Sequence, residues 1–281
     1  MTLFDYLFTL PGVSWSDLLS LFFLALMRMG PIIMLAPFLG AKTAPIIVRT
    51  GLAVMMSVIF LPVLIKHAHR HLEFSPLFLV YSMKELLIGL FLGFLVAMPF
   101  YMVQSGGIII DYSRGASVLQ IQDPSLQNQA SPIGIMYNLI LITIFFNLNG
   151  PILFFESVAD SYAIVPADGF INPSFFGMKG FVWETISSMI AKVIAVGIRL
   201  AAPSLVAILM AEMFLGIANR MAPQVQIAFL GLSIKSLLGL ALLWAGWFFI
   251  LKQSALETES WLRMIRQVVE YFTFMRGGRP S

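Results

Sequence analysis

Long apolar segments that contain single charged residues are the feature that most restricts how this chain can fold. About six such segments can be drawn, each roughly 20 residues or longer, which is the length that an α-helix needs to cross a hydrocarbon core of about 30 Å. They occupy residues 17–39, 44–65, 77–103, 133–155, 181–210 and 225–251. The chain of 281 residues is 59% hydrophobic and 11% charged, whereas soluble domains carry about 25% charged residues. We therefore predict an all-α, integral-membrane domain over residues 1–251.

The remaining residues, 252–281, form a basic tail in which apolar residues alternate with charges as in an amphipathic helix. The Lys and Arg residues of this tail favour a cytoplasmic location. Lys42 and Arg49, in the first loop, favour the opposite orientation. This conflict indicates that the segments do not all lie across lipid in the finished protein. Prolines within or beside the apolar runs predict kinked helical hairpins, because each proline removes a backbone N–H donor.

Ionisable residues within or beside the apolar runs are the first set of candidate sites. A charge at the bilayer centre costs about 2.5–3.5 kcal/mol on insertion scales, so such residues usually face a partner, a cavity or a conduit. Four polar residues between Glu184 and Arg199 fall within an arc of about 80° on one helix face, which predicts an interface or a conduit lining. Ion pairing inside one protomer is the alternative. The candidates are Arg28, Lys84, Glu85, Glu184, Lys192, Arg199, Glu212, Arg220 and Lys235.

The pair Lys84-Glu85 is followed by Gly89 and Gly93. Glycines four residues apart on a helix allow another backbone to approach closely. This pattern favours helix packing, and the sequence leaves open whether the packed helix belongs to the same chain or to another subunit.

A region rich in amides, residues 104–132, separates two of the apolar hairpins. We expect Gly106-Gly107 to interrupt the helix there and Asp111 to pair with Arg114 across one turn. A nearly neutral, hydrogen-bonding segment of this kind suits a plug that lines a path, and an ordinary extramembrane loop is the alternative. The candidate plug residues are Gly106, Gly107, Asp111, Arg114, Gly115, Gln120, Asp123 and Pro124.

Enzyme, cofactor and metal functions are not indicated. The chain has no cysteine, which excludes thiol nucleophiles and iron–sulfur ligation through cysteine, and it has no phosphate-binding Gly-rich loop with a lysine. The three histidines lie together between Lys66 and His71, which is more typical of a solvated basic turn than of a metal site. The basic excess is concentrated in the tail and indicates membrane orientation, not nucleic-acid binding.

The order and spacing of many of these residues resemble the FliR/SctT-type component of the bacterial type III secretion and flagellar export apparatus. The resemblance covers residues 28–235. The run from Asp111 to Gly115, Ser131-Pro132 and Asn149-Gly150-Pro151 is more similar to the injectisome, or virulence, branch than to the flagellar branch. The matching positions are Arg28, Pro31, Pro37, Pro45, Arg49, Lys84, Glu85, Gly89, Gly93, Gly107, Asp111, Gly115, Asp123, Pro124, Gly150, Ala202, Pro203, Glu212, Gly216, Arg220, Pro223, Gln224 and Lys235.

The resemblance implies a single copy in a helical export gate in the bacterial inner membrane, raised partly towards the periplasm. It implies two smaller membrane components, the R-type and S-type subunits, and an autoprotease switch protein as partners. The loop near residues 104–132 would contribute to the plug of a conduit for unfolded protein substrates. We therefore expect a non-enzymatic pore subunit, whose rivals are a small-solute secondary transporter with broken helices and an assembly scaffold outside the conduit wall.

Overall fold

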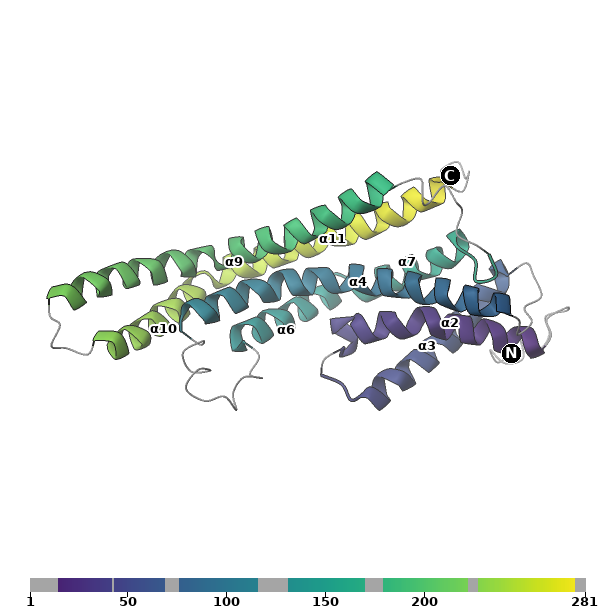
Figure 1. Cartoon of the computed structure of the whole chain (residues 1–281), viewed down its shortest axis with the longest axis horizontal. Coiled ribbons are helices and arrows are strands. Elements are labelled where there is room, and N and C mark those ends of the chain that lie inside the picture. Colours follow the sequence, from purple (N-terminus) through teal and green to yellow (C-terminus); the bar gives the residue numbers. More distant parts are fainter. Residues whose placement is uncertain are drawn as a thin grey trace. The chain divides into compact units, whose positions relative to one another are not determined.

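A computed structural model of the chain (Figure 1) describes residues 15–41, 43–68, 76–115, 131–169, 179–221 and 227–275, with the backbone alone at 179–186, 227–230 and 266–275. Within these ranges the fold is all-α, as predicted, and contains no strand. The elements are α2 (Trp15–Leu35), η1 (Pro37–Leu39), α3 (Ile46–His67), α4 (Pro76–Ser113), α6 (Pro132–Asn147), α7 (Gly150–Ile164), α9 (Lys179–Met221), α10 (Ile227–Ala245) and α11 (Trp247–Met275).

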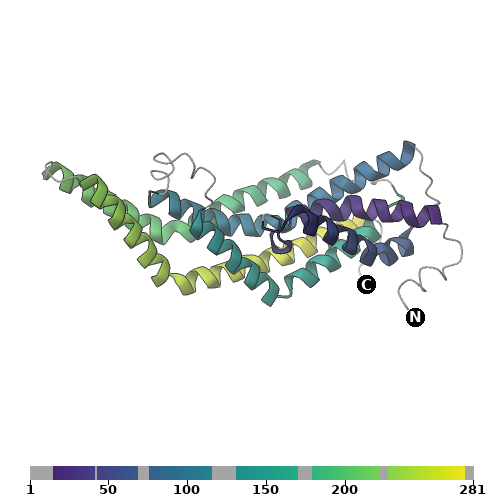
Figure 2. The same cartoon turned by 90° about the horizontal axis from the view of Figure 1, so that it is seen from below.

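The helices match the six predicted apolar segments. Four of them are long and apolar enough to cross a membrane, and the number rises to six when α6–α7 and α10–α11 each count as one broken span. The α10–α11 pair bends by 63°, which is visible where the yellow-green and yellow ribbons meet in Figure 2. The α6–α7 break falls at Asn149, whose φ of 54° lies in the left-handed region. Two of the predicted segments are therefore broken. Prolines do not explain most of the predicted kinks, because Pro31, Pro62, Pro99 and Pro203 lie inside helices that continue past them.

One expected boundary is wrong. The sequence predicts that the helix stops near Gly106-Gly107, but α4 continues without a break to Ser113. Both glycines lie where other helices cross α4 closely, so tertiary packing, and not chain flexibility, explains them. The tail also differs in its start, because α11 begins at Trp247 and runs through residue 252.

The chain forms two compact units. The first comprises Met1–Ala97, Asn149–Phe181 and Leu262–Ser281, and the second comprises Met98–Leu148 and Val182–Trp261. Helix α4 contributes its N-terminal part to the first unit and its C-terminal part to the second.

In the first unit, α2 lies between α3 and the N-terminal part of α4 (Figure 1). The glycines of α4 permit this close crossing. A Cβ atom at Gly89 would lie 2.2 Å from the carbonyl oxygen of Arg28, and one at Gly93 would lie 3.1 Å from Ile32 Cα. The helix that the glycine pattern accommodates is therefore α2 of the same chain.

In the second unit, α6 crosses the C-terminal part of α4 at a pair of glycines. A Cβ atom at Gly107 would lie 2.5 Å from the backbone nitrogen of Gly134. One helical residue earlier, a Cβ atom at Gly106 would lie 3.1 Å from the carbonyl oxygen of Gly197 on α9. Phe100 on α4 and Phe145 on α6 complete this crossing, with ring centroids 5.4 Å apart.

Candidate functional site

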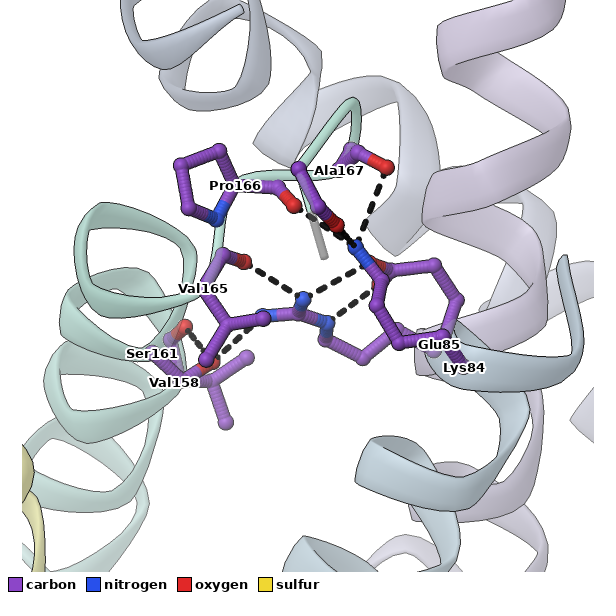
Figure 3. A network of polar contacts seen from close by, with 9 residues as sticks. Lys84, Glu85, Val158, Ser161, Val165, Pro166 and Ala167 are labelled. Atoms are coloured by element: carbon purple, nitrogen blue, oxygen red, sulfur yellow. Dashed lines mark hydrogen bonds and ion pairs between the residues drawn. The ribbon is translucent and has the colours of Figure 1, made fainter. Parts of the chain in front are cut away.

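A buried ion cluster joins α2, α4 and the end of α7 in the first unit (Figure 3). Arg28 is fully buried and donates to both carboxylate oxygens of Glu85, at 2.5 Å from Nε and 2.8 Å from Nη2. Its guanidinium also donates to Ser161 Oγ and to the carbonyl oxygen of Val165, each at 2.9 Å. The ring centroid of Tyr162 lies 3.9 Å from the guanidinium carbon. Two-point pairing between arginine and a carboxylate gives both strength and a fixed orientation.

Lys84 extends the same cluster to the turn that follows α7. Its Nζ lies 2.9 Å from Glu85 Oε1. The ammonium donates to the carbonyl oxygens of Pro166 at 2.6 Å, Ala167 at 3.1 Å and Gly169 at 2.8 Å; Figure 3 shows it facing the first two. These carbonyl groups belong to the turn after α7, where Pro166 also accepts from the backbone N–H of Gly169 at 3.1 Å. Lys84 therefore ties this turn to α4.

The contacts of this cluster indicate a structural role, in which paired charges hold neighbouring segments together. Two cations surround one carboxylate, and every guanidinium nitrogen of Arg28 has an acceptor. Breaking a buried pair is costly because one charge is left uncompensated. Within the described residues, no group of three or more side chains is placed to hold a metal ion. We conclude that Arg28, Lys84 and Glu85 hold three segments of the first unit together.

A second polar centre lies in the second unit, around Asp111 near the end of α4. Asp111 is buried and accepts hydrogen bonds from Arg114 Nη2 and from Ser131 Oγ, and the backbone N–H of Ile133 donates to it at 2.9 Å. Ser131 Oγ in turn accepts from the backbone N–H of Gly134 at 2.9 Å. Ser131 is therefore the N-cap of α6, and Asp111 ties this cap to α4. The expected pairing of Asp111 with Arg114 is confirmed.

Two glycines of the predicted plug region serve packing and turn geometry. Gly107 is packed against α6, so a β-branched residue there would disturb the packing of two helices. Gly115 follows α4 with a φ of 98°, a conformation that favours glycine. Gln120, Asp123 and Pro124 lie outside the described residues.

A third group of charges joins exposed residues of α9 to half-buried ones of α10 and α11. The side chain of Arg199 is 57% exposed and donates to Glu257 at 3.3 Å. Lys235 donates to Glu212 at 2.5 Å, and the Glu212 side chain is 44% exposed. Lys192 is exposed and has no ion-pair partner among the described side chains.

The polar stripe predicted along this helix is only partly visible. Ser188, Lys192 and Arg199 are all exposed, whereas the side chain of Glu184 lies outside what the structure describes. Arg220 is exposed in the last turn of α9.

Several partners in these sites could not be foreseen. The carbonyl groups of residues 165–169 carry no side-chain signal, although the run Pro166-Ala-Asp-Gly169 is typical of a turn. Ser161 and Tyr162 look like ordinary helix residues in the sequence. Glu257 lies in the segment that the sequence predicts to be a separate tail, and nothing in that prediction indicates its pairing with Arg199.

Comparison with known proteins decides the family. Residues 19–260 match the family described as bacterial export proteins, family 1. The chain belongs to this export family.

Similar proteins come from both secretion and flagellar systems. Yop proteins translocation protein T of Yersinia pestis is 29% identical over 199 residues, which are 70% of this chain and 74% of the relative. Flagellar biosynthetic protein FliR of Escherichia coli is 27% identical over 229 residues, 82% of this chain and 85% of the relative. Surface presentation of antigens protein SpaR of Shigella flexneri is 31% identical over 157 residues, 56% of this chain and 58% of the relative.

These matches confirm the resemblance to the FliR/SctT export family, including its injectisome members. Membership supports a role in the export apparatus of a type III secretion or flagellar system. Together with the apolar helices, it is consistent with a multi-pass protein of the inner membrane.

Proposed function

We propose that this export-family chain forms part of the wall of a gated conduit through which unfolded proteins cross the bacterial inner membrane. The observation that carries the proposal is the exposure of Lys192, Arg199 and Glu212 on α9. Residues 187–221 of this helix are apolar and long enough to span a membrane.

Lipid is an unfavourable environment for the charged surface of α9. A charged side chain at bilayer depth faces the interior of an assembly or a water-filled cavity far more often than lipid. The pairs Arg199–Glu257 and Glu212–Lys235 reduce this cost, but they leave both Arg199 and Glu212 substantially exposed. The second unit therefore completes its environment with neighbouring subunits or with the aqueous conduit.

The partners in this proposal are the R-type and S-type membrane components and the autoprotease switch protein of the gate. One copy of the chain, raised partly towards the periplasm, serves in each gate and performs no catalysis, and the energy for export comes from other components. The loop that carries Gln120, Asp123 and Pro124 closes the conduit at rest. The described residues that flank this loop are Gly115, after α4, and Ser131, at the start of α6; Ser131 Oγ donates to Asp111 of α4.

A crosslinking experiment tests the conduit role. A photo-reactive amino acid replaces Tyr112, an exposed residue beside Asp111, or Lys192 on α9, and export is stalled with a substrate fused to a tightly folded domain. We expect the stalled substrate to crosslink at one or both positions. The matched control is Ile47, an exposed residue of α3, where no substrate adduct is expected.

The rivals give different outcomes. If export proceeds normally while the substrate crosslinks at neither Tyr112 nor Lys192, the chain is a scaffold outside the conduit wall. If the purified chain alone moves a small solute across vesicles, the transporter hypothesis replaces the conduit.

A further inference from the structure

An apolar groove on the first unit, between α3 and α7, is not used by any of the sites above. It is shallow and open, with a volume of about 450 Å³, and is lined mainly by aliphatic and aromatic side chains. Phe60 and Phe155, whose ring centroids are 6.1 Å apart, form its floor where the two helices meet. Its lining includes Ile59, Val63, Ile152 and one carboxylate, Glu156.

Glu156 of α7 lines this groove, and a second carboxylate, Asp160, follows one helical turn later and outside the lining. Glu156 and Asp160 are four residues apart on the helix and both are exposed. Neither has a hydrogen-bond or ion-pair partner among the described residues of the chain. Like charges at this spacing repel each other and destabilise a helix, and α7 belongs to a broken span that is apolar enough for a membrane.

Glu156 and Asp160 differ from the buried ion cluster of the first unit, whose charges pair with one another. Arg28, Lys84 and Glu85 neutralise one another inside the unit, so none of these cations is available to Glu156 or Asp160. Because no described residue of the chain supplies a cation to this carboxylate pair, a basic side chain of a binding partner would complement it. The groove provides apolar contact area and the two acids provide charge complementarity to the same binding partner.

We propose that the α3–α7 groove is the docking site for an apolar helix of a companion membrane subunit, and that this helix carries a Lys or Arg that pairs with Glu156 and Asp160. This inference rests on the proposed function, because it names a surface through which the chain enters the assembly. The binding partner is a helix because backbone polar groups at bilayer depth must form hydrogen bonds within the segment itself, as they do in an α-helix. Its apolar face lies in the valley between two helices, as in other helix-in-groove contacts.

A second copy of this chain fits less well. The second copy would have to place a basic helix such as α9 in the groove of the first. Such a head-to-tail contact joins two different surfaces, so it adds further copies without end unless they close a ring. A lipid also fits less well, because anionic headgroups are repelled by the two acids.

The absence of cysteine from the chain makes a site-directed test clean. A single cysteine replaces Ile152, an exposed residue at the groove, in a chain expressed with the complete apparatus. In isolated membranes this cysteine is labelled with a short thiol-reactive photo-crosslinker. We expect an adduct with another membrane subunit, whose crosslinked peptide, identified by mass spectrometry, is an apolar helix with a basic residue. The same label at Ile47, on α3 but outside the groove lining, is the positional control.

Charge reversal then tests the recognition. The double variant Glu156→Lys and Asp160→Lys is expected to lower the adduct yield about tenfold or more, because it places like charges in a desolvated contact. Replacing the partner's basic residue with Glu in the same background should restore the adduct. Because neither acid has a partner within the described chain, the amount of folded protein, measured by size-exclusion chromatography in detergent, should not change.

Three outcomes overturn the proposal. They are an adduct between two copies of this chain, the absence of any protein adduct at Ile152, and a companion adduct that charge reversal leaves unchanged. Any of these can occur while a stalled substrate still crosslinks at Tyr112 or Lys192, so failure of the docking site and failure of the conduit role are distinguishable.

Discussion

Two charge clusters of this chain, one in each unit, treat their charges in opposite ways. In the first unit, Arg28 and Glu85 are fully buried and paired, and Lys84 is buried against backbone carbonyl groups. In the second unit, Arg199 and Glu212 are paired but remain 57% and 44% exposed. The same sequence signal, a charge in an apolar run, therefore has two different structural meanings.

Surfaces with exposed charges depend on an assembly more than surfaces over a neutralised cluster do. A buried cluster that neutralises itself lets the helices around it face lipid or protein equally well. Exposed charges on helices of membrane length require water or a neighbouring subunit to limit their cost. We infer that the fold of the first unit depends mainly on internal pairing, whereas the α9–α10 surface of the second unit depends on its surroundings.

The largest effect is expected from Glu85→Gln, which removes the only carboxylate that contacts both Arg28 and Lys84 in the described structure. Two cations are then buried without compensation, so the free energy of unfolding should fall by about 3–5 kcal/mol. Thermal unfolding of the purified protein in detergent, together with the yield of folded protein, measures this change.

The matched control is Glu212→Gln, the same chemical change at an exposed pair. Its effect on the free energy of unfolding should stay within about 1 kcal/mol. Replacing Arg28 and Glu85 together by methionine should be less harmful than Glu85→Gln alone, because no charge is left unpaired. Equal losses at Glu85 and Glu212 would contradict the contrast between the two units.

A second test compares glycines. Gly89→Ala places a Cβ atom 2.2 Å from the carbonyl oxygen of Arg28, so α2 must move away, at a cost of about 1–3 kcal/mol. Gly216→Ala, on the exposed part of α9, meets no atom within 4 Å and should stabilise the helix by up to about 1 kcal/mol. Unfolding midpoints of the two variants check both signs, and a stable Gly89→Ala protein would show that the crossing is loose.

The fold could be predicted from the sequence to a large extent, because membrane thickness and helix geometry fix the length of an apolar segment. The continuation of α4 through Gly106-Gly107 could not. Glycine has the same appearance in a sequence whether it ends a helix or admits a neighbour, and only the position of α6 and α9 decides between the two.

The candidate sites were predictable as single costly charges and not as networks. Arg28 and Glu85 are 57 residues apart, and their pairing depends on which helices are neighbours. The carbonyl groups that bind Lys84 belong to a turn, and their role follows from its backbone conformation alone. The pairing of Asp111 with Arg114 was predictable, because it is local to one helical turn.

A smaller effect is expected from Lys84→Met. The variant keeps the Arg28–Glu85 pair but removes the ammonium that donates to the carbonyl groups of Pro166, Ala167 and Gly169, of which only Pro166 keeps a backbone donor within the described chain, the N–H of Gly169. This loss should cost about 1–3 kcal/mol. Hydrogen–deuterium exchange should rise locally in residues 165–169 while α2 remains protected. Lys192→Met, which removes an exposed ammonium, is the control and should leave exchange in the first unit unchanged; exchange that rises across α2 as well would show that Lys84 fastens more than the turn.

The smallest effect on stability and the sharpest test of the second unit come from exchanging Glu212 and Lys235. The single variants Glu212→Lys and Lys235→Glu each place like charges together, but at an exposed site this should change the free energy of unfolding by no more than about 1 kcal/mol. Export by the complete apparatus should nevertheless fall strongly, because either change also alters the charge that α9 or α10 presents to its surroundings.

The double exchange restores the internal pair while reversing its direction. If the pair serves only this chain, the double exchange restores export fully. If, as the exposure of Glu212 indicates, the surroundings also recognise the pair, stability returns to that of the natural protein while export remains impaired, and measuring both quantities on the same three variants separates internal fastening from assembly.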